Sequence, residues 1–420
     1  MKTEIYDLAI IGAGASGLAC AISAAQKAKN MKIVLLENKE RVGKKILATG
    51  NGKCNLSNTD TNIEKNYYSD DISLVKKVFN IHNSEDNVNF FNELGLVCRV
   101  DSEGRIYPYS QHSSSVLDAL RNECDRLKIN TKCSVNIINV KKDKDKFKIS
   151  TNDATIICDS LVVASGGMSY VNKQNLSGYE ILKNFGHSIT ELYPSLVALK
   201  AQEPIKSLKG IRFPATVTLY INSKKVQCED GEVQFTEQGI SGIAVMQLSQ
   251  RISKGISQGK KENYTVSLDL MPCHTHEKVV EFINKKIALD AETPTFELLC
   301  GIFHKMLSRA VVVTALQNGL PEKISALSTK QIDDIANCVK NFEFKIVGTM
   351  GFANAQVTGG GARLNQFNTE TMESTIISGL YAAGEVIDVV GACGGFNLNW
   401  AWSSGRIAGE SIAKRSKKDA

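Results

Sequence analysis

Two glycine-rich segments at opposite ends of the chain contain the residues best suited to bind a cofactor. The first follows the apolar run Leu8–Ile11 and opens an alanine-rich stretch with helical spacing. In a strand, tight turn and helix of this kind, the first glycine permits the bend, the second lets a pyrophosphate approach the backbone, and the third lets helix and strand pack closely. The helix N-terminus then faces the phosphate charge. The predicted contacts are Gly12, Gly14, Ala15, Ser16 and Gly17.

An acidic residue at the end of the next apolar run supports this interpretation. Glu37 follows the strand-like run Lys32–Leu36 and lies about 20 residues after Gly17, the spacing at which a carboxylate meets an adenosine ribose. A carboxylate there favours free ribose hydroxyls and repels a 2′-phosphate. A purely structural glycine turn is the alternative, but it explains neither the acidic residue nor its spacing. Glu37 and its neighbour Asn38 are therefore predicted to contact a dinucleotide.

A polar, glycine-rich segment follows, from Arg41 to Asn58. Small residues let the backbone pass close to a flat ligand, and asparagine amides both donate and accept hydrogen bonds. A solvated loop is the alternative, but loops at the carboxyl ends of parallel strands are where such folds bind ligands. Ser165 and Gly166, after the apolar run Leu161–Ala164, are predicted to lie at the same edge. The candidates within the polar segment are Lys45, Thr49, Gly50, Asn51, Cys54 and Asn55.

The second glycine-rich segment, from Gly379 to Asn399, leads into an apolar helix near the C-terminus. A glycine-rich turn before a helix directs free backbone amides and the positive end of the helix dipole toward a ligand. A reduced flavin carries negative charge that such a helix end stabilises. An adenosine site at one end and flavin support at the other favour noncovalently bound FAD over a nicotinamide cofactor. The candidates here are Gly384, Glu385, Gly395, Asn397 and Leu398.

The whole chain resembles a bacterial family of NAD(P)/FAD-dependent flavoproteins, aminoacetone-oxidase-like, that includes 3-dehydro-bile-acid reductase. The matching runs are Gly12–Gly17, Gly43–Asn58, Val357–Gly361 and Gly384–Gly405. The resemblance implies a discontinuous Rossmann-like FAD-binding domain, an inserted antiparallel β-barrel-like domain and a small helical domain. It also implies that Glu385 meets the ribityl chain or the pyrophosphate and that Val135 lies beside adenine. It does not select a substrate.

The pattern along the chain predicts an α/β protein with three domains. Apolar strands alternate with helical stretches up to about Tyr193, as in an open and mostly parallel sheet. A β-rich segment follows, and then a segment with helical periodicity. The predicted domains are an FAD-binding domain (1–193 and 350–420), a β-rich inserted domain (194–273 and 342–349) and a helical domain (274–341).

Composition excludes several classes of protein. Hydrophobic residues make up 43% and charged residues 22%, as in a soluble globular chain. No apolar stretch reaches the roughly 18 residues of a membrane span, and no signal peptide is visible, so we expect a cytoplasmic protein without a membrane partner. The net charge of +6 is spread evenly, which disfavours nucleic acid as a partner. His274 and His276 lack a third ligand, so no metal is predicted. Cys54 and Cys393 are interpreted as packing residues rather than a redox pair.

These observations predict an FAD-dependent oxidoreductase with a small-molecule substrate. The flavin would do the chemistry, which explains why no catalytic residue can be assigned. The leading hypothesis is a reductase in which transiently bound NADH or NADPH reduces the flavin, and the hydride passes to an electron-poor substrate such as a conjugated enone or steroid-like ketone. The alternatives are a flavin amine oxidase with an aminoacetone-like substrate and, less favoured, a flavin-dependent RNA-modifying protein.

Overall fold

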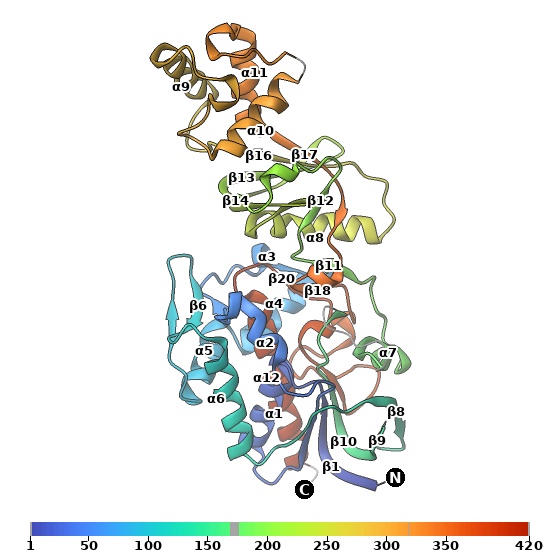
Figure 1. Ribbon diagram of the computed structural model, residues 1–420. Coiled ribbons are helices and arrows are strands. Elements are labelled where there is room, and N and C mark those ends of the chain that lie inside the picture. The colour runs from blue at the N-terminus through green and yellow to red at the C-terminus, as the bar shows by residue number, and fades with distance from the viewer. Residues whose placement is uncertain (1, 169–175, 318, 419–420) are drawn as a thin grey trace. The chain divides into compact units, whose positions relative to one another are not determined.

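The structure is a computed structural model that describes residues 2–168, 176–317 and 319–418. It divides the chain into two compact units, Met1–Tyr193 with Val357–Ala420 and Pro194–Gln356 (Figure 1). The first unit thus combines both ends of the chain, whereas the second is one continuous segment. Residues 274–341 fall inside the second unit, and their separation as a third domain stays a prediction.

A mostly parallel sheet forms the centre of the first unit. Its strand order is β7-β2-β1-β10-β9-β8, and β19 also pairs with β10. β9 and β8 form an antiparallel extension, whereas the other pairs are parallel. All residues of β2 are buried, as expected for a strand covered on both faces. The bounds are β1 Lys2–Ile11, β2 Ile33–Leu36, β7 Asn130–Lys132, β8 Ile137–Asp143, β9 Lys146–Thr151, β10 Ala154–Val163 and β19 Leu380–Ala382.

Two helices from opposite ends of the chain pack against each other in this unit. α1 (Ala15–Lys27) follows the first glycine turn, and α12 (Phe396–Lys418) follows the second glycine-rich segment. Gly405 of α12 lies so close to the backbone of Ser16 that a side chain there would overlap it, and Gly409 meets α1 in the same way one turn later. This close approach depends on the absence of side chains at the two glycines, and it brings the two predicted motifs together.

Shorter elements complete the first unit, and one of them, β11, begins at its last residue before the second unit and ends in the second unit. Three strands form a small sheet in the order β3-β6-β5, β4 pairs with β20, and β11 pairs with β18. The strand bounds are β3 Ser57–Asn58, β4 Tyr67–Tyr68, β5 Cys98–Val100, β6 Arg105–Pro108, β11 Tyr193–Ser195, β18 Val357–Gly359 and β20 Val390–Gly391. The helices are α2 Lys44–Ala48, α3 Ile63–Asn66, α4 Ile72–Ile81, α5 Ser84–Glu93, α6 Ser113–Arg126 and α7 Gly178–Asn184.

A closed antiparallel barrel forms the core of the second unit, with the strand order β12-β15-β14-β13-β16-β17. Its inward-facing positions are apolar, and Val217, Leu219, Val266 and Leu268 are fully buried. The barrel confirms the predicted fold class, an α/β protein with a Rossmann-like domain and an inserted β-barrel-like domain. The strands are β12 Leu199–Ala201, β13 Arg212–Ile221, β14 Lys224–Thr236, β15 Gly239–Ser241, β16 Tyr264–Asp269 and β17 Phe342–Thr349.

The helices of the second unit differ from the sequence prediction in two places. α8 (Ile243–Ser257) lies within the segment that the sequence predicts as β-rich. Residues 298–316 lie within the segment that the sequence predicts as helical, but α10 (Lys305–Leu316) covers only their second part. Gly301 precedes it with φ +98°, which interrupts a regular helix. The remaining helices are α9 His276–Leu289 and α11 Thr329–Lys340.

Among the described residues, no helix combines the length and hydropathy that crossing a membrane requires. No group of three His, Cys, Asp or Glu side chains in the same residues is arranged to hold a metal ion.

Candidate functional site

The three glycines of the first motif have three different surroundings. Gly12 has φ +102° and lies against the end of β10, where a side chain would overlap the carbonyl of Ala164. Gly17 lies equally close to the carbonyl of Gly12. Gly14 instead has an ordinary backbone conformation (φ −86°, ψ −162°), and no described heavy atom lies within 4 Å of the position that a Cβ would occupy. The turn is therefore packed at its first and third glycines and open at its second, at the N-terminus of α1.

Glu37 joins the carboxyl ends of β1 and β2. Its Oε2 accepts a hydrogen bond from the amide of Ala13 (3.0 Å), and its Oε1 accepts one from the amide of Lys39 (3.0 Å). Each carboxylate oxygen has a further lone pair for a ligand hydroxyl. The amide of Val135 donates to the backbone carbonyl of Glu37 (2.9 Å), so the backbones of these two residues are adjacent, and Asn38, the next residue in the chain, is exposed.

The polar segment after α2 turns through left-handed backbone conformations. Gly50 has φ +56°, Asn51 +53° and Cys54 +57°. Thr49 donates from its Oγ1 to the carbonyl of Ile46 (2.7 Å) and fixes the start of the turn. Burial raises the pKa of the Cys54 thiol to about 12, so this thiol is protonated at neutral pH. A protonated, fully buried thiol supports the packing interpretation of Cys54 over a redox role.

The polar segment Arg41–Asn58 contacts the second glycine-rich segment at the start of α12. The Asn58 side chain donates from Nδ2 to the carbonyl of Gly394 (2.9 Å). Gly395 has φ +99° and lies against the carbonyl of Ser57, and a Cβ there would come within 2.7 Å of Asn55 Oδ1. That buried oxygen has no hydrogen-bond partner among the described residues. The structure therefore places Asn55 and Gly395, which come from separate motifs, side by side.

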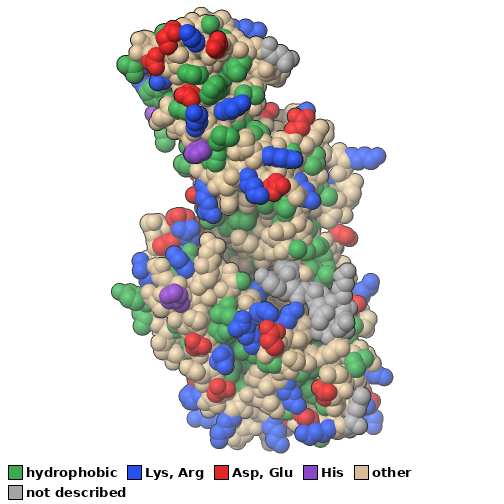
Figure 2. Space-filling view, in the orientation of Figure 1, with side chains coloured by type: hydrophobic (Ala, Val, Ile, Leu, Met, Phe, Trp, Pro, Cys, Tyr) green, Lys and Arg blue, Asp and Glu red, His purple; other side chains and the backbone are tan. Residues whose placement is uncertain are grey.

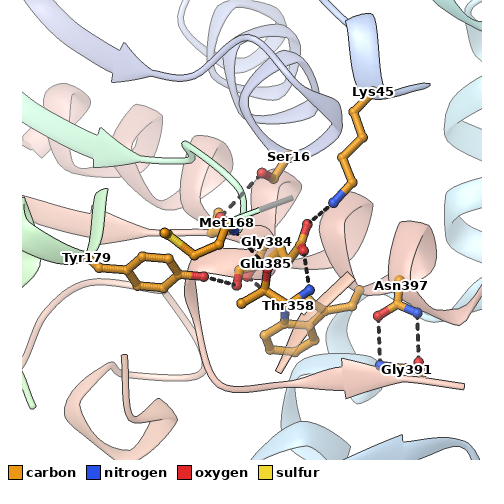
Figure 3. Close-up of polar contacts among 11 residues, drawn as sticks. Ser16, Lys45, Met168, Tyr179, Thr358, Gly384, Glu385, Gly391 and Asn397 are labelled. Carbon is orange, nitrogen blue, oxygen red and sulfur yellow. Dashed lines mark hydrogen bonds and ion pairs between the residues drawn. The ribbon is translucent and has the colours of Figure 1, made fainter. Parts of the chain in front are cut away.

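Asn397 fixes the loop that leads into α12. Its side-chain oxygen accepts from the amide of Gly391 (2.8 Å), and its Nδ2 donates to the carbonyl of the same residue (2.7 Å; Figure 3). Leu398 is partly buried against the core of the first unit. The Asn397 side chain thus bonds both backbone groups of Gly391. These two bonds fix the loop relative to the N-terminus of α12.

Glu385 connects three segments that are distant in sequence. Its Oε1 accepts from the amide of Thr358 in β18 (2.7 Å), and its Oε2 accepts from Lys45 Nζ in α2 (2.5 Å; Figure 3). Thr358 Oγ1 accepts in turn from the amide of Met168, after β10 (2.8 Å). A Cβ at Gly166 would lie 3.9 Å from Glu385 Oε2, so Gly166 presents no side chain of its own beside the carboxylate.

The remaining candidates pack against neighbouring segments. Ser16 donates from Oγ to the carbonyl of Ala383 (3.3 Å), directly before Gly384. Ser165 lies against Gly178 at the start of α7, where a larger residue would overlap its hydroxyl. Ala15 is half-buried in the first turn of α1. These contacts join the first motif, the β10 edge and the C-terminal motif.

Sequence reasoning missed several polar residues behind the motifs. Asn399 Oδ1 accepts from Asn87 Nδ2 (2.8 Å) and from Ser57 Oγ (2.9 Å), which links α12 to α5 and β3. Thr358 is a polar residue followed directly by three glycines, and this pattern was a weak indication in the sequence that it belongs to the site. Asn87 gave no signal, because its partners lie more than 300 positions later in the chain.

Comparisons with known proteins show the family of this chain. The family model described as "HI0933-like protein Rossmann domain" matches residues 6–411. The chain is 34% identical over 411 residues to 3-dehydro-bile acid delta(4,6)-reductase of Clostridium scindens, covering 97% of this chain and 99% of that protein. It is 30% identical over 416 residues to the ribosomal RNA dihydrouridine synthase of Haemophilus influenzae, covering 97% and 98%. The corresponding Escherichia coli synthase is 28% identical over 413 residues, 96% of each chain.

Among solved structures, a 3-ketosteroid delta1-dehydrogenase from Sterolibacterium denitrificans shares the fold. Its TM-score is 0.50 at 11% identity, with 98% of this chain and 100% of that chain covered. The family model matches nearly the whole chain, and the reductase that is 34% identical aligns with 97% of it. The chain therefore belongs to the HI0933-like Rossmann family and is a flavoprotein oxidoreductase.

Proposed function

We propose that this protein binds FAD noncovalently and, with NADH or NADPH as reductant, reduces a carbon–carbon double bond conjugated to a carbonyl in a small organic molecule. The observation that carries the proposal is the full-length relation to a reductase whose name specifies delta(4,6) double bonds of a 3-dehydro bile acid. In such a substrate the double bonds are conjugated to the 3-ketone, which makes the distal carbon electron-poor and able to accept hydride.

The described residues fit the cofactor. The open position at Gly14 leaves room for a pyrophosphate at the N-terminus of α1. Glu37 can accept hydrogen bonds from ribose hydroxyls, and Asn55 Oδ1 is a buried acceptor without a partner among the described residues. The first turn of α12 offers backbone amides for the flavin end. Bound FAD supplies hydride transfer, while these residues bind and orient it.

A second candidate substrate is a uracil base in ribosomal RNA. The relatives at 30% and 28% identity are both named ribosomal RNA dihydrouridine synthases. Forming dihydrouridine saturates a double bond conjugated to a carbonyl. The two candidate substrates therefore share the type of bond that is reduced and differ in the molecule that carries it. We favour the small molecule because basic and acidic side chains are intermixed on the face shown in Figure 2. Amine oxidation ranks third, since these three relatives carry the names of a reductase and synthases.

An anaerobic assay separates the candidates. NADH or NADPH should bleach the flavin absorbance of the purified protein, and a steroid enone should restore it. Rapid bleaching by small amines, with no response to either nicotinamide, would establish the oxidase. Restoration by uridine-containing ribosomal RNA, together with loss of dihydrouridine from the ribosomal RNA of a deletion strain, would establish the RNA candidate.

Substitution of Glu37 tests the adenosine end. Glu37→Ala should weaken FAD binding by about 1.5–3 kcal/mol, because hydrogen bonds to a carboxylate are lost. Titration of apoprotein with FAD, followed by the quenching of flavin fluorescence, measures the change. Glu37→Gln should weaken FAD binding less than Glu37→Ala, because glutamine keeps one acceptor oxygen. Mass spectrometry of the released cofactor must give FAD, and release of FMN instead would contradict the proposal.

A further inference from the structure

We propose that Lys45 and Glu385 act as one coupled unit in dinucleotide binding, in which Lys45 supplies the positive charge that allows an acidic side chain to lie beside an anionic cofactor. The inference rests on the proposed FAD function. It assigns Lys45 the role of a positioning residue that acts through Glu385, and it predicts that neither residue contributes independently.

The geometry holds Glu385 in place. Both carboxylate oxygens are engaged, one by the amide of Thr358 at 2.7 Å and one by Lys45 Nζ at 2.5 Å (Figure 3). The hydroxyl of Tyr179 lies 3.5 Å from its backbone carbonyl. A side chain at Gly167 would overlap the carboxylate, so the glycine is required for this arrangement. Glu385 is therefore fixed beside Gly166 and cannot turn away from a ligand there without losing these bonds.

Lys45 is anchored to the predicted pyrophosphate turn. α2 begins directly after Gly43, which has φ +65°, and the Gly43 amide donates to the carbonyl of Ala13 (2.9 Å). Ala13 is also the residue whose amide donates to Glu37. The backbone that carries the ammonium group is thus tied to the glycine motif, while the ammonium group reaches the C-terminal motif.

Charge explains why the two residues must be coupled. The diphosphate of FAD is anionic, and a fixed carboxylate nearby repels it unless a cation compensates. The Lys45 and Glu385 side chains are 33% and 18% exposed, so solvent screens the pair incompletely. In the described part of the chain, Lys45 is the cation that forms an ion pair with Glu385.

The neighbouring residue provides a natural control. Lys44 lies on the same short helix but pairs with Glu40 at 2.9 Å, and those side chains are 43% and 64% exposed. Such a solvated pair contributes little to binding or stability. Removing the charge of Lys44 therefore tests whether the loss of any positive charge on α2 weakens FAD binding, or only the loss of the one paired with Glu385.

A double-mutant cycle on FAD affinity tests the coupling. Wild-type, Lys45→Met, Glu385→Gln and double-variant apoproteins are titrated with FAD by fluorescence quenching, and their melting temperatures are recorded without FAD. Lys45→Met should weaken binding about tenfold to a hundredfold, the effect of losing a charge-assisted contact. In the Glu385→Gln background the same change should cost less than about threefold, because no fixed negative charge remains to be compensated. Lys45→Arg should restore most of the affinity, and Lys44→Met should keep it.

Independent roles would give losses that multiply in the double variant, and this result would overturn the coupling. Unchanged affinity in Lys45→Met would overturn it as well. If Lys45→Met apoprotein does not fold, Lys45→Gln takes its place in the cycle. A wild-type protein that binds no FAD contradicts the proposed function itself, which distinguishes that failure from a failure of the coupling.

Discussion

Replacing Gly14 with alanine is expected to weaken FAD binding strongly while leaving the apoprotein folded. The backbone of Gly14 is one that alanine adopts, and the added methyl meets no described atom within 4 Å. Alanine is a poorer N-cap than glycine, which costs less than about 1 kcal/mol. A methyl group at this position nevertheless occupies the space through which a pyrophosphate reaches the backbone amides. We expect affinity for FAD to fall by roughly a hundredfold or more, since hydrogen bonds to charged phosphate are lost.

Two matched variants make this test specific. Gly17→Ala adds the same methyl group to the same motif but overlaps the carbonyl of Gly12, so it should lower the melting temperature of the apoprotein. Gly348→Ala lies in β17 with no described atom within 4 Å of the new Cβ, so it should change neither stability nor FAD affinity. Wild-type affinity in Gly14→Ala would show that the pyrophosphate lies elsewhere.

Gly395→Ala should damage both folding and FAD binding. A Cβ there overlaps the carbonyl of Ser57 and comes within 2.7 Å of Asn55 Oδ1, and φ is +99°. The added methyl group would push apart the loops that contain Ser57 and Gly395, which should destabilise the protein by about 1–3 kcal/mol, the usual cost of overpacking. The predicted flavin end of the site would move with these loops. Thermal unfolding of the apoprotein and the flavin-to-protein absorbance ratio of the purified variant measure the two effects.

Gly351→Ala separates overlap from backbone strain. Gly351 also has a positive φ, +74°, but no described atom lies within 4 Å of its would-be Cβ. It should therefore show the cost of the strained backbone alone and retain full flavin content. If Gly395→Ala kept both its flavin and its melting temperature, the contact between Ser57 and Gly395 would have no importance for the site.

The fold could be predicted because local rules determine it, and the adenosine end of the site, which stays a prediction, is inferred from rules of the same kind. A short-range pattern of strand, glycine turn and helix specifies the first motif, and the acidic residue follows at a fixed spacing. The alternation of the barrel strands likewise follows from one buried face. α8 was missed because it interrupts a β-rich segment, and the start of α10 depends on the conformation of a single residue, Gly301.

The contacts between motifs could not be predicted from the sequence. The pairing of Lys45 with Glu385 and the contact of Asn55 with Gly395 each join positions about 340 residues apart. No local sequence pattern encodes a contact between positions so far apart in the chain, because such contacts form only when α12 packs on α1. Resemblance selected runs of residues that the structure brings into contact, but Thr358 and Asn87 became visible as parts of the arrangement only through their hydrogen bonds.

The packing of α12 on α1 has a consequence for biosynthesis. The second unit is a continuous segment with its own core, so all of its residues have left the ribosome before α12 is made. The first unit, in contrast, lacks the partner of α1 until the whole second unit has been made. The glycine turn before α1 therefore waits for a helix that is synthesised after the entire second unit, and the predicted cofactor site can be completed only then.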